Sequence, residues 1–150
     1  MIVNKKILAI TLARGGSKSV PRKNIKEICG KPLIAYTIEE ALKSSYIDDF
    51  IVSTDDDEIK AVSEKYKAKV PFIRPSDLSE DKSSSSSALV HAVNFMENHN
   101  SCKYDFIIEL MCTNPLKNSF DIDTIIEKAY ETNSESCLLY TSDAADDLGR

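Results

Sequence analysis

The fold is decided by residues 7–16, ILAITLARGG, near the start of the 150-residue chain. The mostly apolar run 7–13 predicts a buried β-strand. The pair Gly15-Gly16 then ends the strand, and glycine both accepts positive φ and lets a ligand approach the backbone closely. We therefore expect a strand that leads directly into a ligand-binding loop.

Positive charge is concentrated around this loop. Segment 14–31 contains six basic residues and one acid, whereas the whole chain has a formal net charge of −5. The basic residues are Arg14, Lys18, Arg22, Lys23, Lys26 and Lys31. A glycine loop that follows a strand and is edged by cations suits a polyphosphate, although the spacing matches neither of the two common phosphate-loop motifs. The alternative is a basic surface loop.

The composition indicates one globular domain, with 42% hydrophobic and 29% charged residues. Acids outnumber bases, 24 to 19, which argues against a nucleic-acid partner because such a partner needs a broad basic face. No apolar run reaches membrane-spanning length, and we expect no signal peptide. The four cysteines match no metal or redox spacing, so we expect reduced thiols in a cytoplasmic protein without a membrane partner.

Strand-like and helix-like segments alternate along the chain. We expect strands at 50–54, 70–73 and 104–111, and helices at 32–43, from Asp55 onward, after the serine run 83–87, and at 121–130. This alternation predicts an α/β fold with a doubly wound, mostly parallel sheet. Such sheets bind ligands beyond the carboxyl ends of their strands, so the glycine loop, Asp55, Arg74 and the turn 112–115 should share one edge.

Local patterns give more detailed expectations. Asp55 and Glu58 have the spacing of a capping box, so we expect Asp55 to cap a helix. Helical periodicity predicts two buried faces. The expected inward residues are Ile34, Ile38 and Leu42 in the first helix and Leu89, Val90, Val93 and Met96 in the third.

Two segments together resemble the opening signature of the acylneuraminate cytidylyltransferases, the CMP–sialic acid synthetases and their relatives that act on other nonulosonic acids. They are residues 12–25, LARGGSKSVPRKNI, and 30–37, GKPLIAYT. The resemblance implies a nucleotide-diphospho-sugar transferase-like Rossmann-type fold. It implies that the anomeric hydroxyl of an acidic nine-carbon sugar attacks the α-phosphate of CTP and that pyrophosphate leaves. It also implies Mg²⁺, with ligands beyond the end of this chain, so we assign no metal ligand.

The resemblance also assigns site residues. It implies catalytic roles for Arg14 and Lys23, and the segment 72–78, FIRPSDL, resembles an arginine-containing element that holds the cytidine. The implied nucleotide-binding residues are Arg14, Gly15, Gly16, Ser17, Lys18, Lys23, Asn24, Arg74, Ser84 and Ser85. For Lys18 and Arg22 the alternative is a solvated face, and for the serine run it is a polar loop.

One segment departs from the family pattern. Residues 110–117 read LMCTNPLK, whereas many family members read Leu-Gln-Pro-Thr-Ser-Pro-Leu-Arg. Met111 replaces a glutamine that lies near the sugar, and its thioether cannot supply the hydrogen bonds of an amide. From the family pattern we expect Met111, Thr113 and Asn114 to contact the sugar. Because the glutamine is missing, the identity of that sugar stays open.

The final residues differ from the rest. Segment 137–146, CLLYTSDAAD, resembles the translation of a sequencing-library adapter. We therefore expect 1–136 to be the N-terminal part of a cytidylyltransferase domain and 137–150 to be a non-native tail. Alternatively, 137–140 is the next strand. Such a fragment should be inactive, whereas the full-length protein should form a homodimer.

Two other functions stay open for the chain. One is CMP-Kdo synthetase, whose similar loop lacks the Arg22-Lys23-Asn24 continuation found here. The other is a non-catalytic nucleotide-binding module.

Overall fold

The computed structural model describes residues 4–16, 20, 22–79 and 84–134. Its centre is a parallel three-stranded sheet in the order β4-β1-β5. The strands are β1 (Ile7–Leu12), β4 (Asp49–Ser53) and β5 (Phe106–Glu109). The expected tail, 137–150, lies outside the described residues.

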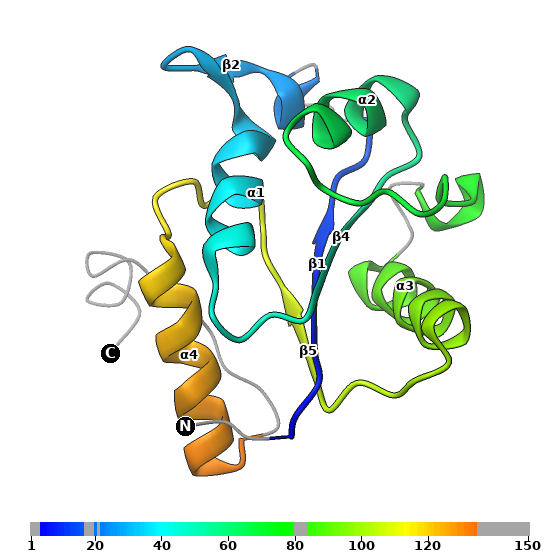
Figure 1. Ribbon diagram of the computed structural model, residues 1–150. Helices are drawn as coiled ribbons and strands as arrows, with labels where there is room; N and C mark the ends of the chain where they lie inside the picture. The colour runs from blue at the N-terminus through cyan, green and yellow to red at the C-terminus, as the bar shows by residue number, and fades with distance from the viewer. Residues whose placement is uncertain (1–3, 17–19, 21, 80–83, 135–150) are drawn as a thin grey trace, which may run out of the picture.

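Helices cover both faces of this sheet (Figure 1). Helices α1 (Leu33–Lys43) and α4 (Ser119–Thr132) lie on one face, and α3 (Ser85–Asn100) lies on the other. Helix α2 (Asp57–Lys65) follows β4 near the carboxyl ends of the strands. This arrangement confirms the predicted α/β fold with a parallel sheet.

Short elements complete the described chain. Strands β2 (Glu27–Ile28) and β3 (Lys31–Pro32) form an antiparallel pair before α1. The 3₁₀-helices are η1 (Lys23–Ile25) and η2 (Ser76–Leu78). No helix in the described part of the chain is both long enough and apolar enough to cross a bilayer.

Strand β1 supplies both halves of the core because its side chains alternate between the two faces. Ile7 and Ala9 belong to the cluster that includes Ile38 of α1 and Ile122 of α4. Leu8 and Ile10 belong to a second cluster, with Ala92 and Met96 of α3. Two helical layers therefore hold β1 in the middle of the molecule.

The outer strands are shorter or less buried than expected. The predicted strand 104–111 is ordered as a strand only over Phe106–Glu109, and it is half-buried because it lies at the edge of the described sheet. The predicted strand 70–73 is wrong. That stretch makes isolated bridges to β4, from Lys69 to Ile51 and from Ile73 to Thr54, and Pro71 between them cannot donate to a continuous ladder.

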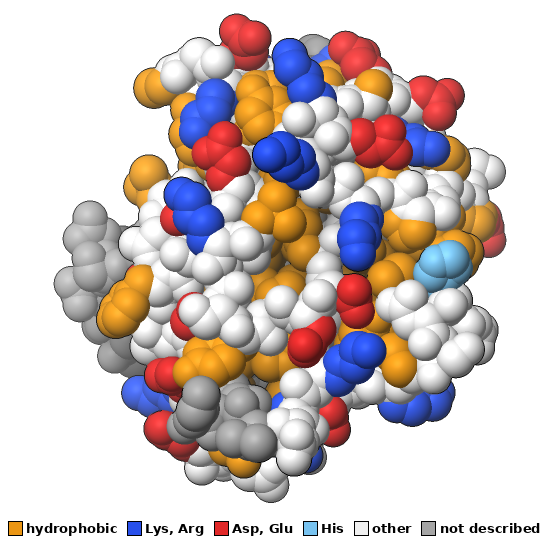
Figure 2. Space-filling model, viewed as in Figure 1, with side chains coloured by type: hydrophobic (Ala, Val, Ile, Leu, Met, Phe, Trp, Pro, Cys, Tyr) orange, Lys and Arg blue, Asp and Glu red, His pale blue; other side chains and the backbone are white. Residues whose placement is uncertain are grey.

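Two side chains expected in the core are exposed. Leu42 is 48% exposed and Val90 is 58% exposed, so both inward faces were assigned too broadly. In α3 the buried residues are Ala88, Ala92 and Met96. Figure 2 shows basic and acidic side chains interspersed on one face of the molecule, with a band of hydrophobic side chains between them.

The predicted capping box of α2 is wrong by one residue. Asp56 caps the helix, because its carboxylate accepts a hydrogen bond from the Ile59 N–H at 2.9 Å. Asp55 is thereby left outside the helix, with its side chain available to the loop after β1. A capping box does open α4, between Asn118 and Asp121, so this helix begins earlier than expected.

Candidate functional site

The glycine loop leaves β1 at the carboxyl edge of the sheet. The Gly15 N–H donates to Asp55 Oδ1 at 2.9 Å. A Cβ added at Gly15 would lie 2.7 Å from Asp56 Oδ2, whereas one added at Gly16 would meet no atom within 4 Å. Neither glycine has a positive φ. Glycine is therefore needed at position 15 for close approach of α2, and not for the positive φ that the sequence suggested.

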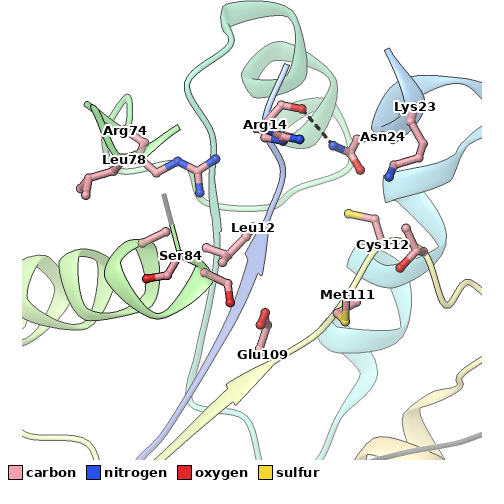
Figure 3. Close-up of a pocket in the computed structure, with 13 residues that line it drawn as sticks. Leu12, Arg14, Lys23, Asn24, Arg74, Leu78, Ser84, Glu109, Met111 and Cys112 are labelled. Carbon is pink, nitrogen blue, oxygen red and sulfur yellow. Dashed lines mark hydrogen bonds between the residues drawn. The ribbon is translucent and has the colours of Figure 1, made fainter. Parts of the chain in front are cut away.

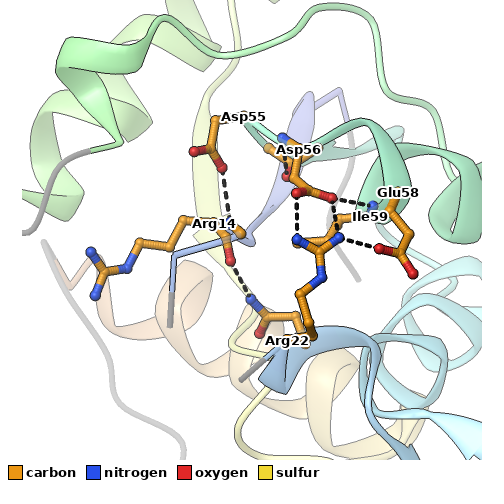
Figure 4. Close-up of polar contacts among 9 residues, drawn as sticks. Arg14, Arg22, Asp55, Asp56, Glu58 and Ile59 are labelled. Carbon is orange, nitrogen blue, oxygen red and sulfur yellow. Dashed lines mark hydrogen bonds and ion pairs between the residues drawn. The ribbon is translucent and has the colours of Figure 1, made fainter. Parts of the chain in front are cut away.

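Arg22 fastens the far end of this loop to α2 (Figure 4). Its guanidinium donates to Asp56 at 2.7 and 2.8 Å and also to Glu58. The hydrogen bond from Arg22 holds the pKa of Asp56 below its usual value. Arg22 is thus paired with two acids at the start of α2, although its side chain is 40% exposed. Its expected assistance to the phosphates stays a prediction. Ser17 and Lys18 lie outside the described residues.

Asn24 and Lys23 bring η1 against the loop. Asn24 is buried, and its side-chain amide donates to the Arg14 carbonyl oxygen at 3.1 Å. Its amide therefore fixes the backbone at Arg14, in addition to lining the cavity described below. Lys23 lines the same cavity, so the predicted residues Arg14, Lys23 and Asn24 lie together.

Arg74 is a buried cation at the same edge. Its N–H bonds to the Thr54 carbonyl oxygen at 2.8 Å, which extends the pairing beyond β4. Its guanidinium Nε donates to Ser79 Oγ at 3.0 Å, and the residue is 4% exposed. Burial lowers the pKa of Arg74, the charge of Asp55 opposes that shift, and the nearby Arg14 adds to it. Two guanidinium groups held close together favour an anion between them.

The amino end of α3 faces this group of cations. Ser84 caps the helix by accepting a hydrogen bond from the Ser87 N–H at 3.1 Å. Ser84 and Ser85 line the cavity, and the last serines of the run belong to α3 rather than to a polar loop. A helix amino terminus carries partial positive charge, which attracts anions.

These groups surround a cavity of about 340 Å³ at the carboxyl ends of the strands (Figure 3). Its cationic side chains come from the loop after β1, from η1 and from the segment after α2. Its lining residues are Leu12, Arg14, Lys23, Asn24, Arg74, Leu78, Ser84, Ser85, Ala88, Glu109, Met111, Cys112 and Thr113. Segments far apart in the sequence thus form one polar site.

The turn after β5 supplies the opposite wall. Met111 and Thr113 line the cavity, and Met111 is 59% exposed. Their predicted contact with the sugar stays a prediction. Asn114 is absent from the lining residues, and its backbone N–H bonds to the Met111 carbonyl oxygen at 3.2 Å. The structure therefore keeps Asn114 out of the described cavity. Cys112 is buried, which raises the pKa of its thiol to about 12.

Lys117 is a functional candidate that the sequence reasoning missed. It is buried, and its ammonium donates to the Met111 and Asn114 carbonyl oxygens at 2.7 and 2.6 Å and to Thr37 Oγ1 at 2.9 Å. Burial lowers the pKa of Lys117 to about 8. The lysine ties the cavity-lining turn to α1. Two of its partners are backbone groups, which leave no signal in the sequence.

Glu109 is a second residue that was missed. It ends β5 and lines the cavity as its one acid among the described residues. The described residues contain no group of three or more His, Cys, Asp or Glu side chains that could hold a metal ion. The donor set of the described residues does not fit a Mg²⁺ ion held by the protein alone.

The fold and the cavity define a class of protein. The predicted residues Gly15 and Gly16 do not line the cavity. A parallel α/β sheet with cations and a helix amino terminus around one cavity is an anion- and nucleotide-binding architecture. The family model for cytidylyltransferases matches residues 8–149. The chain belongs to the cytidylyltransferase family.

Curated relatives narrow the comparison. Pseudaminic acid cytidylyltransferase of Campylobacter jejuni is 47% identical over 126 residues, covering 84% of this chain and 52% of the relative. A Legionella pneumophila CMP-N,N'-diacetyllegionaminic acid synthase is 37% identical, covering 81% and 52%. The Escherichia coli N-acylneuraminate cytidylyltransferase is 38% identical, covering 85% and 29%. These homologues are CMP–nonulosonic acid synthetases, and the chain spans about half the length of the first of them.

A solved structure supports the fold. CMP:2-keto-3-deoxy-manno-octonic acid synthetase complexed with CTP superposes with a TM-score of 0.71 over 87% of this chain and 49% of that one. The sequence identity is 24%, so this likeness concerns the fold alone.

Proposed function

We propose that this chain carries the CTP-binding part of an enzyme that joins CTP to a nonulosonic acid, giving a CMP-sugar and pyrophosphate. The observation that carries the proposal is the convergence of Arg14, Lys23 and Arg74 with the amino end of α3 on one cavity. Arg14, Lys23 and the helix terminus suit the charge of a triphosphate, and Arg74 is the cation that the family resemblance assigns to the cytidine.

The chemistry assigns a task to each group. The anomeric hydroxyl oxygen of the sugar bonds to the α-phosphorus and gives up its proton to solvent water, and the bond from that phosphorus to the bridging oxygen breaks. The electron pair of the broken bond leaves on pyrophosphate. Arg14 and Lys23 stabilise the charge that grows on the phosphate oxygens, as preorganised cations do in phosphoryl transfer. Mg²⁺ belongs to this proposal as a partner of the triphosphate that adds positive charge.

The sugar class rests on the relatives' names. The relatives described above act, by name, on pseudaminic, diacetyllegionaminic and N-acylneuraminic acids. Pseudaminic acid is the first sugar to test, because the relative named for it is 47% identical. Met111 stands where the family resemblance expects glutamine, so this position offers the sugar a thioether in place of an amide.

Titration calorimetry with CTP tests the nucleotide site. Arg14→Ala and Lys23→Ala should each weaken CTP binding by about 1.5–3 kcal/mol, because each removes a charged hydrogen-bond donor from a phosphate. Lys128→Ala is the matched control, since Lys128 is exposed on α4, on the far side of α1 from the cavity. Unchanged CTP affinity in both cavity variants, or no CTP binding by the unmodified chain, would contradict the proposal.

A second candidate is a nucleotide-binding module without catalysis. The length of the chain, about half that of the first curated relatives, favours it as a description of the polypeptide itself. CTP binding without formation of a CMP-sugar would favour the binding module, whereas product formation would favour the enzyme.

A further inference from the structure

Glu109 has an unusual place in the cavity. It pairs in register with Ile10 of β1, and paired residues of neighbouring parallel strands project to the same face of a sheet. Ile10 packs beneath α3, so the Glu109 side chain lies on the α3 face, where the cavity opens. Figure 3 shows its carboxylate at the bottom of the cavity as drawn, with Arg74, Arg14 and Lys23 above it.

The carboxylate of Glu109 is half-buried and has no recorded hydrogen bond or ion pair within the part of the chain that the structure describes. The cations of the cavity do not neutralise it directly. An ionised carboxylate can only accept hydrogen bonds. It therefore repels a phosphate and attracts a hydroxyl or amino group.

The pairing register of β1 and β5 places Glu109 and Arg14 at different ends of the site. Ile10, the partner of Glu109, lies four residues before Arg14. β1 ends at Leu12, so Arg14 lies in the loop beyond the strand, whereas Glu109 is level with Ile10 inside it. A nucleotide also has two ends, one anionic and one rich in neutral hydrogen-bond donors. Its phosphates suit the Arg14 end, and its nucleoside suits the Glu109 end.

We propose that Glu109 is a specificity-determining residue that accepts a hydrogen bond from a hydroxyl or amino group of the nucleoside, while Arg14 and Lys23 take the phosphates. This inference rests on the proposed function, because it assigns the second half of the same nucleotide. The donor is either a ribose hydroxyl or the amino group of the base. A charged acceptor makes this hydrogen bond stronger than a neutral one.

Glu109→Gln tests the inference in the full 150-residue chain. Without divalent cations, cytidine should bind about tenfold more weakly to this variant, as expected when a hydrogen bond loses its charged partner. Inorganic tripolyphosphate should bind equally well or more tightly, because a repelling charge has gone. Glu64→Gln is the matched control, since Glu64 is exposed on α2 and makes the same change of charge.

Two additions sharpen this test. Glu109→Asp keeps the charge but shortens the side chain, so it should weaken cytidine and leave tripolyphosphate unchanged. Uridine has a carbonyl oxygen in place of the amino group of the base, and 2′-deoxycytidine and 3′-deoxycytidine each lack one ribose hydroxyl. The nucleoside without the donor used by Glu109 should bind no more weakly to the variant than to wild type.

The outcomes separate this inference from the proposed function. CTP binding by the wild type, with equal cytidine affinity in wild type and Glu109→Gln, would overturn the inference alone. An equal effect on every nucleoside would also overturn it, as would loss of tripolyphosphate affinity only when Mg²⁺ is present, which would indicate a metal contact. Failure of the wild type to bind both CTP and tripolyphosphate would overturn the proposed function and the inference with it.

Discussion

Lys117 holds a buried positive charge against neutral oxygen atoms. Its three hydrogen-bond acceptors are two backbone carbonyls and the hydroxyl of Thr37. A neutral amine has two N–H donors and one lone pair, and a hydroxyl can either accept or donate. Deprotonated Lys117 can thus keep both carbonyls and accept from Thr37. The turn at Met111 therefore stays attached to α1 in both protonation states.

The free energy of unfolding should depend on the protonation of Lys117 between pH 8 and 10. Burial lowers the pKa of Lys117 from 10.5 to about 8, so in this range the unfolded chain binds more protons than the folded one. The contribution of Lys117 to the free energy of unfolding must then rise with pH. We expect that free energy, measured by urea unfolding for wild type relative to Lys117→Met, to rise by about 1–2 kcal/mol from pH 8 to 9.5.

The comparison with Lys117→Met is needed because other groups act in the opposite direction. Burial raises the pKa of Cys112 from 9.0 to about 12 and also raises the pKa of Tyr104. As the pH rises above the pKa that either group has in the unfolded chain, that group lowers the free energy of unfolding. A difference between wild type and Lys117→Met that stays flat from pH 8 to 9.5 would show that the lysine is not desolvated.

Single residues also mark the limit of prediction from sequence. The sequence pointed to Arg14, Lys23, Arg74 and Ser84, and these residues meet at one cavity because parallel strands end at one edge of the sheet. Their roles in binding stay predictions. Lys117 was missed because a lysine near a turn is ordinarily solvated, and only tertiary packing buries it.

At the scale of elements, the loop after β1 and the start of α2 form one unit. Asp55 accepts from the Gly15 N–H, while Asp56 both caps α2 and binds Arg22. One short acidic stretch thus fastens both ends of the loop. Gly15 and Arg22 are therefore both held against the start of α2.

Gly15→Ala should disturb this unit, whereas Gly16→Ala should not. The new Cβ at position 15 would lie 2.7 Å from Asp56 Oδ2 and 3.0 Å from Asp56 Cβ, and Asp56 is held by Arg22 and by its cap. We expect a loss of about 1–3 kcal/mol in the free energy of unfolding, as for an overpacked site. Gly16→Ala has open space and should be neutral or slightly stabilising. Equal urea midpoints for the two variants would contradict this account.

The types of the elements were predicted well, whereas the cap position and the inward-facing residues were predicted less well. Alternating patterns identified β1, β4 and the four helices, because buried stripes leave a clear period in the sequence. The cap of α2 was misplaced because consecutive acids 55–58 are equivalent in sequence and only the backbone decides which one caps. Leu42 and Val90 were assigned inward because hydrophobicity alone cannot set the width of a buried face.

At the scale of the whole molecule, we expect CTP binding without catalytic turnover. The described residues offer no metal-ligand cluster, and the chain spans about half the length of the first curated relatives. We therefore expect the 150-residue chain to bind CTP but to form no CMP-pseudaminic acid above a no-enzyme control with CTP, sugar and Mg²⁺. A full-length relative is the positive control. Product formation by the short chain would refute this prediction.

The strand order β4-β1-β5 also has a consequence during synthesis. The middle strand emerges first, whereas one of its neighbours is complete only at Glu109. A ribosome adds about 5–20 residues per second, so on the order of 3–10 s pass between completion of β4 and completion of β5. During that interval one hydrogen-bonding edge of β1 is open, and such an edge can pair with another chain. Slow translation between Ser53 and Phe106 would therefore lower the yield of correctly folded protein.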